Sequence, residues 1–236
     1  RSHVLLIGPS CTGLDSQCRL IWCADNDRAV MRLEKNGART VLSAGLDGKR
    51  FSGPNDIAIR ADDGVYVTDN DFGLRDAGKS PDKQMPNGVW LIRDGRSRMV
   101  LDDKSLGGMP NGVALSPDQK HLYLTAFSKL WRYDVNLDGS LGDRVLFAEG
   151  PGIGDGMKVD KRGDVYSTGG GGPVGGCSTA AACKLLGLIN LPVYGGEPKK
   201  QICATNLAFG GPGRHDLYIA ACDDVFRIRL RSTGPR

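Results

Sequence analysis

The sequence lacks the features that identify several common protein classes. No apolar run approaches the length needed to cross a bilayer, so no membrane span is expected. No Cys-x₂-Cys pair is present, which argues against a structural zinc module. The Gly-x-Ser-x-Gly turn of many serine hydrolases does not occur, and the three histidines are poorly placed for a catalytic triad. Chemistry that depends on a serine nucleophile is therefore not expected.

The chain also lacks a concentrated charge of one sign. Its 31 Lys and Arg and 27 Asp and Glu residues give a net charge of +4 and are scattered along the sequence. A nucleic-acid-binding protein would more often gather its basic residues on one face or in a recognisable module. We therefore expect no nucleic-acid partner.

Helix-period apolar patterns are scarce, whereas glycine is abundant at 34 of 236 residues. Short alternating apolar runs separated by Asp, Gly, Asn or Pro are typical of many short strands joined by tight turns. The composition therefore predicts an all-β fold.

One pattern repeats along the chain. Residues 54–70 show it most clearly: a polar residue opens an alternating strand, a turn follows, and a second strand ends in a small or polar residue. Four other stretches share this pattern, and the opening residues of the five copies are Thr12, Asn55, Asn111, Asp155 and Asn206. They are 43, 56, 44 and 51 residues apart, near the period of propeller blades. The repeat predicts a single β-propeller domain over residues 1–236.

Several details of the blades can be predicted in the same way. Asn36-Gly37 between alternating runs indicates a hairpin turn. Residues 69–84 form an excursion that could border a central site. In the fourth copy we expect residues 169–176, almost all glycine, to be a flexible loop, with the third and fourth strands at 187–190 and 200–202.

Seven cysteines are more than a cytosolic chain of this size needs. Cys11 with Cys18, and Cys177 with Cys183, are close enough to close small loops. The other interpretation is that cysteines in apolar strands, such as Cys23 and Cys222, are free and buried. Both interpretations stay open, as does the compartment, cytoplasmic or exported.

The five opening residues suggest a metal site. In a propeller the innermost strands start near the central axis, so these residues converge although they are distant in sequence. All five carry a side-chain oxygen, and none is His or Cys, which suits a hard cation: calcium first, then magnesium or manganese, rather than structural zinc. The alternative is that each only bonds its own backbone in a turn. For Asn55, Asn111 and Asp155 together we favour the site.

Three further residues are candidates for substrate contact. Thr12 and Asn206 open repeats, and Phe72 lies in the loop that follows the strand leaving Asn55. The loop could cover a pocket at the axis. We therefore expect Thr12, Phe72 and Asn206 to line the substrate site.

Four motifs in order resemble the gluconolactonase, senescence marker protein and luciferin-regenerating enzyme family. They are Ser52-Gly53-Pro54-Asn55-Asp56, Pro110-Asn111-Gly112-Val113, Gly154-Asp155-Gly156-Met157 and Thr205-Asn206-Leu207-Ala208. The resemblance extends from about Thr12 to Ile228. It implies a six-bladed propeller that holds one divalent metal on its axis and hydrolyses lactones, some members cleaving organophosphates.

The resemblance also implies roles for individual residues. Asn111 and Asp155 would be metal ligands, Asn55 a further ligand or a residue that orients substrate, and Asp155 also the catalytic base. The family's glutamate ligand, in a Glu-Gly-Pro motif of the first blade, has no counterpart, since Ile7 precedes Gly8-Pro9. We expect the first blade to be incomplete or absent from this sequence; loss of the ligand is the alternative.

The resulting hypothesis is a metal-dependent lactonase whose partner is a small-molecule lactone. Calcium is the favoured cation, with magnesium, manganese and zinc as the other candidates. Two alternatives stay open: a non-catalytic propeller that binds a ligand or a partner protein, and a metal-free enzyme like strictosidine synthase. The sequence predicts neither the oligomeric state nor the particular lactone.

Overall fold

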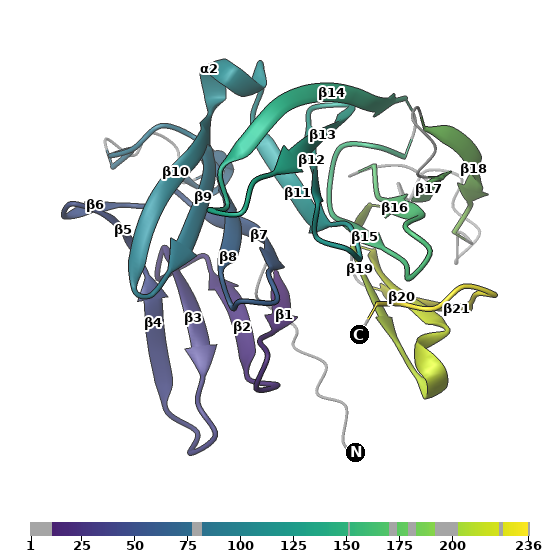
Figure 1. The fold of residues 1–236 in the computed structure, drawn as a ribbon, viewed down its shortest axis with the longest axis horizontal. Helices are drawn as coiled ribbons and strands as arrows, with labels where there is room; N and C mark the ends of the chain where they lie inside the picture. Colours follow the sequence, from purple (N-terminus) through teal and green to yellow (C-terminus); the bar gives the residue numbers. More distant parts are fainter. Residues whose placement is uncertain are drawn as a thin grey trace. The chain divides into compact units, whose positions relative to one another are not determined.

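The computed structural model describes residues 11–76, 82–150, 152–169, 174–178, 183–191, 203–221 and 224–235. Over these ranges the chain consists almost entirely of antiparallel strands, which confirms the all-β prediction (Figure 1). The chain divides into two compact units; the first ends at Met109 and the second begins at Pro110. One domain over residues 1–236 stays a prediction.

The first unit contains two four-stranded antiparallel sheets. The first sheet comprises β1 (Thr12–Leu14), β2 (Leu20–Ala24), β3 (Ala29–Leu33) and β4 (Arg39–Ser43), and the second comprises β7 (Pro54–Ile59), β8 (Val65–Asp69), β9 (Gly88–Arg93) and β10 (Arg96–Asp102). The short hairpin of β5 (Gly45–Leu46) and β6 (Lys49–Arg50) lies between them in sequence, and two short helices follow strands, α1 (Phe72–Asp76) and α2 (Asp103–Leu106). In both sheets, strands that are consecutive along the chain are neighbours.

The alternating apolar residues of these strands form the core of the first unit. Strand β7 contacts both β1 and β2, so the innermost strands of the two sheets are adjacent. Phe51 and Trp90 pack edge to face with ring centroids 5.6 Å apart. Tyr66 in β8 is also fully buried, so the aromatic residues of these strands contribute to packing.

The second unit contains two four-stranded sheets and one three-stranded sheet. The third sheet of the chain comprises β11 (Pro110–Leu115), β12 (His121–Ala126), β13 (Lys129–Val135) and β14 (Leu141–Glu149). The fourth comprises β15 (Met157–Val159), β16 (Val165–Ser167), β17 (Val174–Ser178) and β18 (Lys184–Ile189), and the fifth comprises β19 (Ala204–Gly210), β20 (Asp216–Ala221) and β21 (Asp224–Arg229), with a 3₁₀ turn η1 (Pro212–Arg214). Strand β15 contacts both β11 and β19, so the innermost strands of these three sheets are consecutive neighbours.

Aromatic pairs contribute to the core of the second unit, both within a sheet and between neighbouring sheets. Tyr123 packs edge to face on Phe147 at 5.0 Å, and Tyr166 on Phe209 at 5.6 Å between ring centroids. Met157, fully buried, lies in the cluster shared by the third and fourth sheets. Within the described residues no helix has the length and apolar character that a membrane crossing requires.

The predicted hairpin turn at Asn36-Gly37 is confirmed, but the strands predicted for the fourth sheet are not. Gly37 has φ +85° and its N–H donates to the carbonyl of Glu34, as the Asn-Gly signal predicts. The expectation of a flexible loop is wrong for residues 174–176, which belong to β17 (Val174–Ser178), the third strand of the sheet. The fourth strand is β18 at Lys184–Ile189, where residues 187–190 were expected as the third. A glycine-rich stretch shows no alternation, yet its backbone can pair with β16 without side chains. The predicted strand at 200–202 lies outside the described residues, and so do residues 77–81 of the excursion.

Candidate metal centre and active site

The innermost strands β7, β11 and β19 each carry a β-bulge at their start, and this sets the positions of Asn55 and Asn111. In β7 the partner of Asp69 is Pro54 and that of Thr68 is Asp56, so Asn55 is the extra residue. In β11 the same shift places Asn111 between Pro110 and Gly112. Bulges occur next to active sites because they redirect a side chain out of the ladder. Asn55, in the first unit, and Asn111, in the second, thus have equivalent backbone positions.

The register corrects the assumed phase of two predicted residues. In β19 Ala204 pairs with Ala221 and Asn206 with Ala220, so the bulge residue is Thr205, and Asn206 is one position later. In β1 Thr12 pairs with Trp22, and two further residue pairs follow before the turn. In β7 the residue with two further pairs before the turn is Ile57, so Thr12 corresponds to Ile57. Thr12, although it is the first residue of β1, is therefore not in phase with Asn55. The residue in that phase is number 10, outside the described residues.

The structure brings the backbones of Asn111 and Asp155 together. Gly112, which follows Asn111, lies so close to Asp155 that a Cβ on Gly112 would be 2.3 Å from the Asp155 carbonyl oxygen. The Thr125 hydroxyl accepts a hydrogen bond from the Gly112 N–H at 2.8 Å and donates one to the same carbonyl at 2.9 Å. The half-buried Asp155 is also held by its N–H, which donates to the carbonyl of Thr168 at 2.9 Å. Two predicted ligands on neighbouring sheets are thus fixed at the same end of the second unit.

The side chain of Asn111 has the property expected of a metal ligand. Its Oδ1 is buried and has no hydrogen-bond partner among the described residues. An unsatisfied buried acceptor costs about 1–3 kcal/mol, so this oxygen would be stabilised by a donor or a cation that reaches it. A hard cation such as calcium takes amide and carboxylate oxygens, which Asn111 and Asp155 supply. No group of three His, Cys, Asp or Glu side chains that could hold a metal occurs in the described part of the chain. The residues present fit a cation bound through amide oxygen as well as carboxylate.

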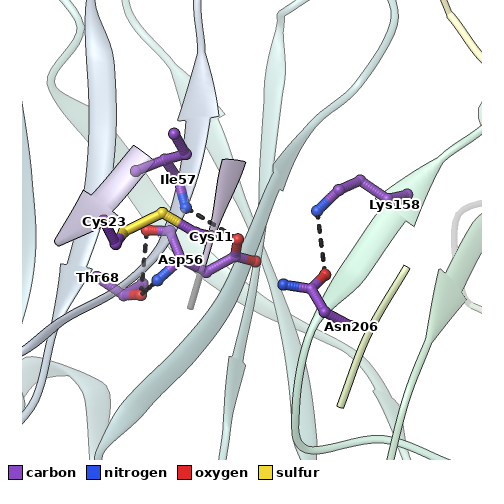
Figure 2. The surroundings of a disulfide bond; sticks show 7 residues. All are labelled: Cys11, Cys23, Asp56, Ile57, Thr68, Lys158 and Asn206. Carbon is purple, nitrogen blue, oxygen red and sulfur yellow. Dashed lines mark hydrogen bonds between the residues drawn. A yellow bond between two sulfur atoms is a disulfide. The ribbon is translucent and has the colours of Figure 1, made fainter. Parts of the chain in front are cut away.

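Asn206 is engaged differently. Its Oδ1 accepts a hydrogen bond from the Leu207 N–H at 2.8 Å and lies 3.4 Å from the Lys158 ammonium, which also donates to the carbonyl of Met157 at 2.8 Å (Figure 2). The oxygen therefore bonds the next residue of its own backbone, the turn role considered as the alternative for each strand-start residue. A contact between Asn206 and substrate stays a prediction.

Lys158 is a residue that sequence reasoning missed. In three other innermost strands its register position holds alanine opposite tyrosine, the pairs being Ala58 with Tyr66, Ala114 with Tyr123, and Ala208 with Tyr218. In β15 the residue opposite Tyr166 is Lys158. An alignment of the repeats by strand register would have revealed Lys158, because a lysine stands where three other repeats have alanine.

A buried carboxylate, that of Asp69, holds the segment that precedes Asn55. Asp69 accepts hydrogen bonds from the N–H groups of Ser52 at 2.9 Å and Gly53 at 2.8 Å, which fixes the segment leading into Asn55. Burial raises the pKa of Asp69 to about 6, although these two donors lower it. Asp56, which follows Asn55 in the chain, is buried, and its Oδ1 accepts a hydrogen bond from the Ile57 N–H at 2.9 Å (Figure 2).

Phe72 begins α1, where its N–H donates to Asn70 Oδ1 at 3.1 Å. Its side chain is 61% exposed, which is unusual for phenylalanine. A contact between Phe72 and substrate stays a prediction.

The disulfide of the first sheet differs from the expected pairing. Cys11 bonds Cys23, with Cα atoms 5.2 Å apart, while Cys18 is free and exposed among the described cysteines (Figure 2). The expectation of a Cys11–Cys18 loop is therefore wrong, as is the expectation that Cys23 is free. Cys23 donates its N–H to the carbonyl of Cys11, because the two lie opposite each other on adjacent strands, whereas Cys18 sits in the turn. Cys183 and Cys203 are also disulfide-bonded.

Known proteins share the sequence and the architecture of this chain. It is 34% identical over 236 residues to a gluconolactonase of Zymomonas mobilis, an alignment that covers 91% of this chain and 61% of that protein. The solved structure of a gluconolactonase from Xanthomonas campestris has a TM-score of 0.77 and 27% identity, covering 93% of this chain and 71% of that one. A calcium-binding protein, regucalcin, from Agrobacterium tumefaciens has a TM-score of 0.71 and 19% identity, covering 98% and 79%.

The chain thus spans less than two thirds of the length of the Zymomonas relative. The solved structures show that its fold is an all-β β-propeller, of which the described residues form four complete four-stranded sheets. The sequence matches the family described as "SMP-30/Gluconolactonase/LRE-like region" over residues 7–223. The chain belongs to the SMP-30/gluconolactonase/LRE-like family.

Proposed function

We propose that this protein is a divalent-metal-dependent lactonase that opens a sugar lactone, or a similar cyclic ester, by attack of water. The observation that carries the proposal is the buried, unsatisfied Oδ1 of Asn111, whose neighbour in the chain, Gly112, packs against the backbone of Asp155. The similarity to a gluconolactonase supports the substrate class. We also propose that the complete propeller has six blades, as its family does.

Asn111 and Asp155 would hold the cation, with Asn55 as a further ligand or as the residue that orients the lactone. Calcium suits these neutral and acidic oxygens best, and the related regucalcin is described as calcium-binding. Magnesium, manganese and zinc are the other candidates. When bound, the cation supplies Lewis acidity that polarises the ester carbonyl and makes a coordinated water more acidic.

The remaining chemistry belongs to Asp155 and its surroundings. The carboxylate of Asp155 accepts a proton from the attacking water while the water oxygen bonds to the carbonyl carbon. The ring C–O bond then breaks and the proton passes to the leaving oxygen, giving an open hydroxy acid. No serine or cysteine nucleophile takes part.

Two of the predicted substrate contacts are kept in this proposal. Asn206, positioned by Lys158, would bind hydroxyl groups of the substrate, and Phe72 would cover it. Thr12 is left out, because its register matches that of Ile57 and not that of Asn55.

The test is hydrolysis of a panel of sugar lactones with and without EDTA, repeated for Asp155→Ala. We expect chelation to abolish turnover and Asp155→Ala to lower kcat by about 10²–10⁴-fold, the usual contribution of a positioned base. Asp143→Asn, which changes an exposed carboxylate on β14, is the matched control and should keep full activity.

Hydrolysis that is unaffected by EDTA and by Asp155→Ala would refute the mechanism. Absence of turnover on every lactone, together with binding of one of them, would instead favour the non-catalytic propeller. A condensing activity that survives chelation would favour the enzyme like strictosidine synthase.

A further inference from the structure

Threonine occupies one register position in three of the five innermost hairpins. Thr68, Thr125 and Thr168 lie on the second strand or directly after it, opposite the strand start, and each is fully buried. Thr68 lies in the first unit, and its hydroxyl accepts a hydrogen bond from the N–H of Asp56 at 2.9 Å. Of the other two, Thr125 contacts both segments that carry the proposed ligands.

The hydroxyl of Thr125 is used fully. Its oxygen accepts from the Gly112 N–H at 2.8 Å, and its single proton is directed to the Asp155 carbonyl at 2.9 Å, with the Gly112 carbonyl more distant at 3.4 Å. Gly112 directly follows Asn111. One buried side chain therefore joins the backbone next to one proposed ligand to the backbone of the other, across two sheets.

This spacing leaves little tolerance. The absent Cβ of Gly112 permits the approach, and the hydroxyl bridge fixes its distance. Calcium–oxygen distances fall within about 2.3–2.6 Å, so a shift of one strand start relative to the other would change the geometry of the ligand pair. A residue that holds ligands in place without touching the ion belongs to the outer shell of a metal site.

We propose that Thr125 is a positioning residue for the metal site, setting the separation of Asn111 and Asp155 through its hydroxyl. The inference rests on the proposed function, because it needs a cation at those two residues. A purely structural role would predict a loss of stability without a specific loss of metal binding.

The test compares Ca²⁺ binding by calorimetry in chelator-stripped wild type, Thr125→Val and Thr125→Ser. Valine keeps the shape of threonine without the hydroxyl, and we expect its Kd for Ca²⁺ to rise about 10–100-fold, as for other outer-shell changes. Serine keeps the hydroxyl and should bind like wild type. The kcat of Thr125→Val should fall and recover partly in excess Ca²⁺.

Ser116→Ala is the matched control. Ser116 lies in the turn of the same hairpin, is 6% exposed, and its hydroxyl accepts from the His121 N–H at 3.0 Å and donates to Asp118 at 2.6 Å. Its loss should lower stability without changing the Kd for Ca²⁺. If Thr125→Val does not fold, Thr125→Cys, with a weaker donor in a similar volume, should show an intermediate Kd.

Two outcomes are distinguishable. A wild type that binds Ca²⁺ with the same Kd as folded Thr125→Val, or as folded Thr125→Cys where valine is not tolerated, would overturn the role of Thr125 and leave the proposed function intact. A wild type that binds no Ca²⁺ and hydrolyses lactones in EDTA would overturn the proposed function and this inference with it.

Discussion

At the scale of single residues, two asparagines that look alike in sequence have different hydrogen-bonding states. Asn111 keeps a buried oxygen with no partner among the described residues, whereas the oxygen of Asn206 accepts from Leu207 and lies near Lys158. A ligand must be able to offer its lone pairs to a cation. Of these two asparagines, Asn111 has the more available oxygen.

We therefore expect Asn111→Ala and Asn206→Ala to separate metal binding from substrate binding. Asn111→Ala should raise the Kd for Ca²⁺ at least about tenfold and leave the stability of the metal-free protein equal or higher, because it removes an unsatisfied acceptor. Asn206→Ala should keep the Kd for Ca²⁺ and raise KM. Calorimetry and steady-state kinetics measure both, and equal effects on Ca²⁺ binding would contradict the distinction.

The buried Asp69 gives a pH dependence with a defined sign. Its pKa of about 6 in the folded state lies above its value near 3.8 in the unfolded chain. Between these values the folded state keeps a proton that the unfolded state releases, so the stability that Asp69 contributes is full below about pH 4 and is lost as pH rises through about 6. The shift of about 2 units corresponds to about 2–3 kcal/mol.

Urea unfolding of wild type and Asp69→Asn at pH 4 to 7 measures this effect. Asparagine does not titrate, so the stability difference between wild type and variant should decrease as pH rises over this range. Asp69→Asn should also be less stable at pH 4, because its amide NH₂ faces one of the two N–H groups that the carboxyl accepts from. A difference that does not vary with pH would mean that the pKa is not raised.

At the scale of elements, the first hairpin is closed by a covalent bond between opposite strands. Cys11 and Cys23 are 12 residues apart in sequence. A disulfide that closes a loop of that size raises the free energy of unfolding by about 3 kcal/mol. The double variant Cys11→Ala with Cys23→Ala should lower the free energy of unfolding by about 2–4 kcal/mol. Denaturant unfolding under oxidising conditions measures it.

Cys18→Ser is the control for this prediction. Cys18 is exposed in the turn, and surface changes of that kind usually alter stability by less than about 0.5 kcal/mol. A double variant as stable as wild type, or a Cys18→Ser variant as unstable as the double variant, would show that the hairpin is not held by this bond.

At the scale of the whole molecule, the strands of the described sheets could largely be predicted because alternation records which side chains are buried. Residues 54–70, for example, predict two strands around a turn, and they contain β7 and β8. Strand β17 could not be predicted, because glycine leaves no alternation to detect. Backbone pairing alone places it in the sheet.

The repeat predicted which segments of the chain carry the candidate site, but not in every case which residue occupies the strand-start position. The repeat placed Asn55 and Asn111 correctly in phase, but a bulge adds one residue, so Asn206 was assigned a position that belongs to Thr205. The Cys11–Cys23 pairing likewise depends on which residues face each other across a hairpin, and not on their distance along the chain. The role of Thr125 was also missed, because a hydroxyl that bonds only backbone leaves no motif.

The contact of Gly112 with the backbone of Asp155 has a consequence for protein engineering. Where main chain packs against main chain, the fit does not depend on the side chains at the rims of the sheets. Libraries that randomise the exposed loops for new substrates should therefore keep the spacing of the strand starts, provided that this glycine is left unchanged.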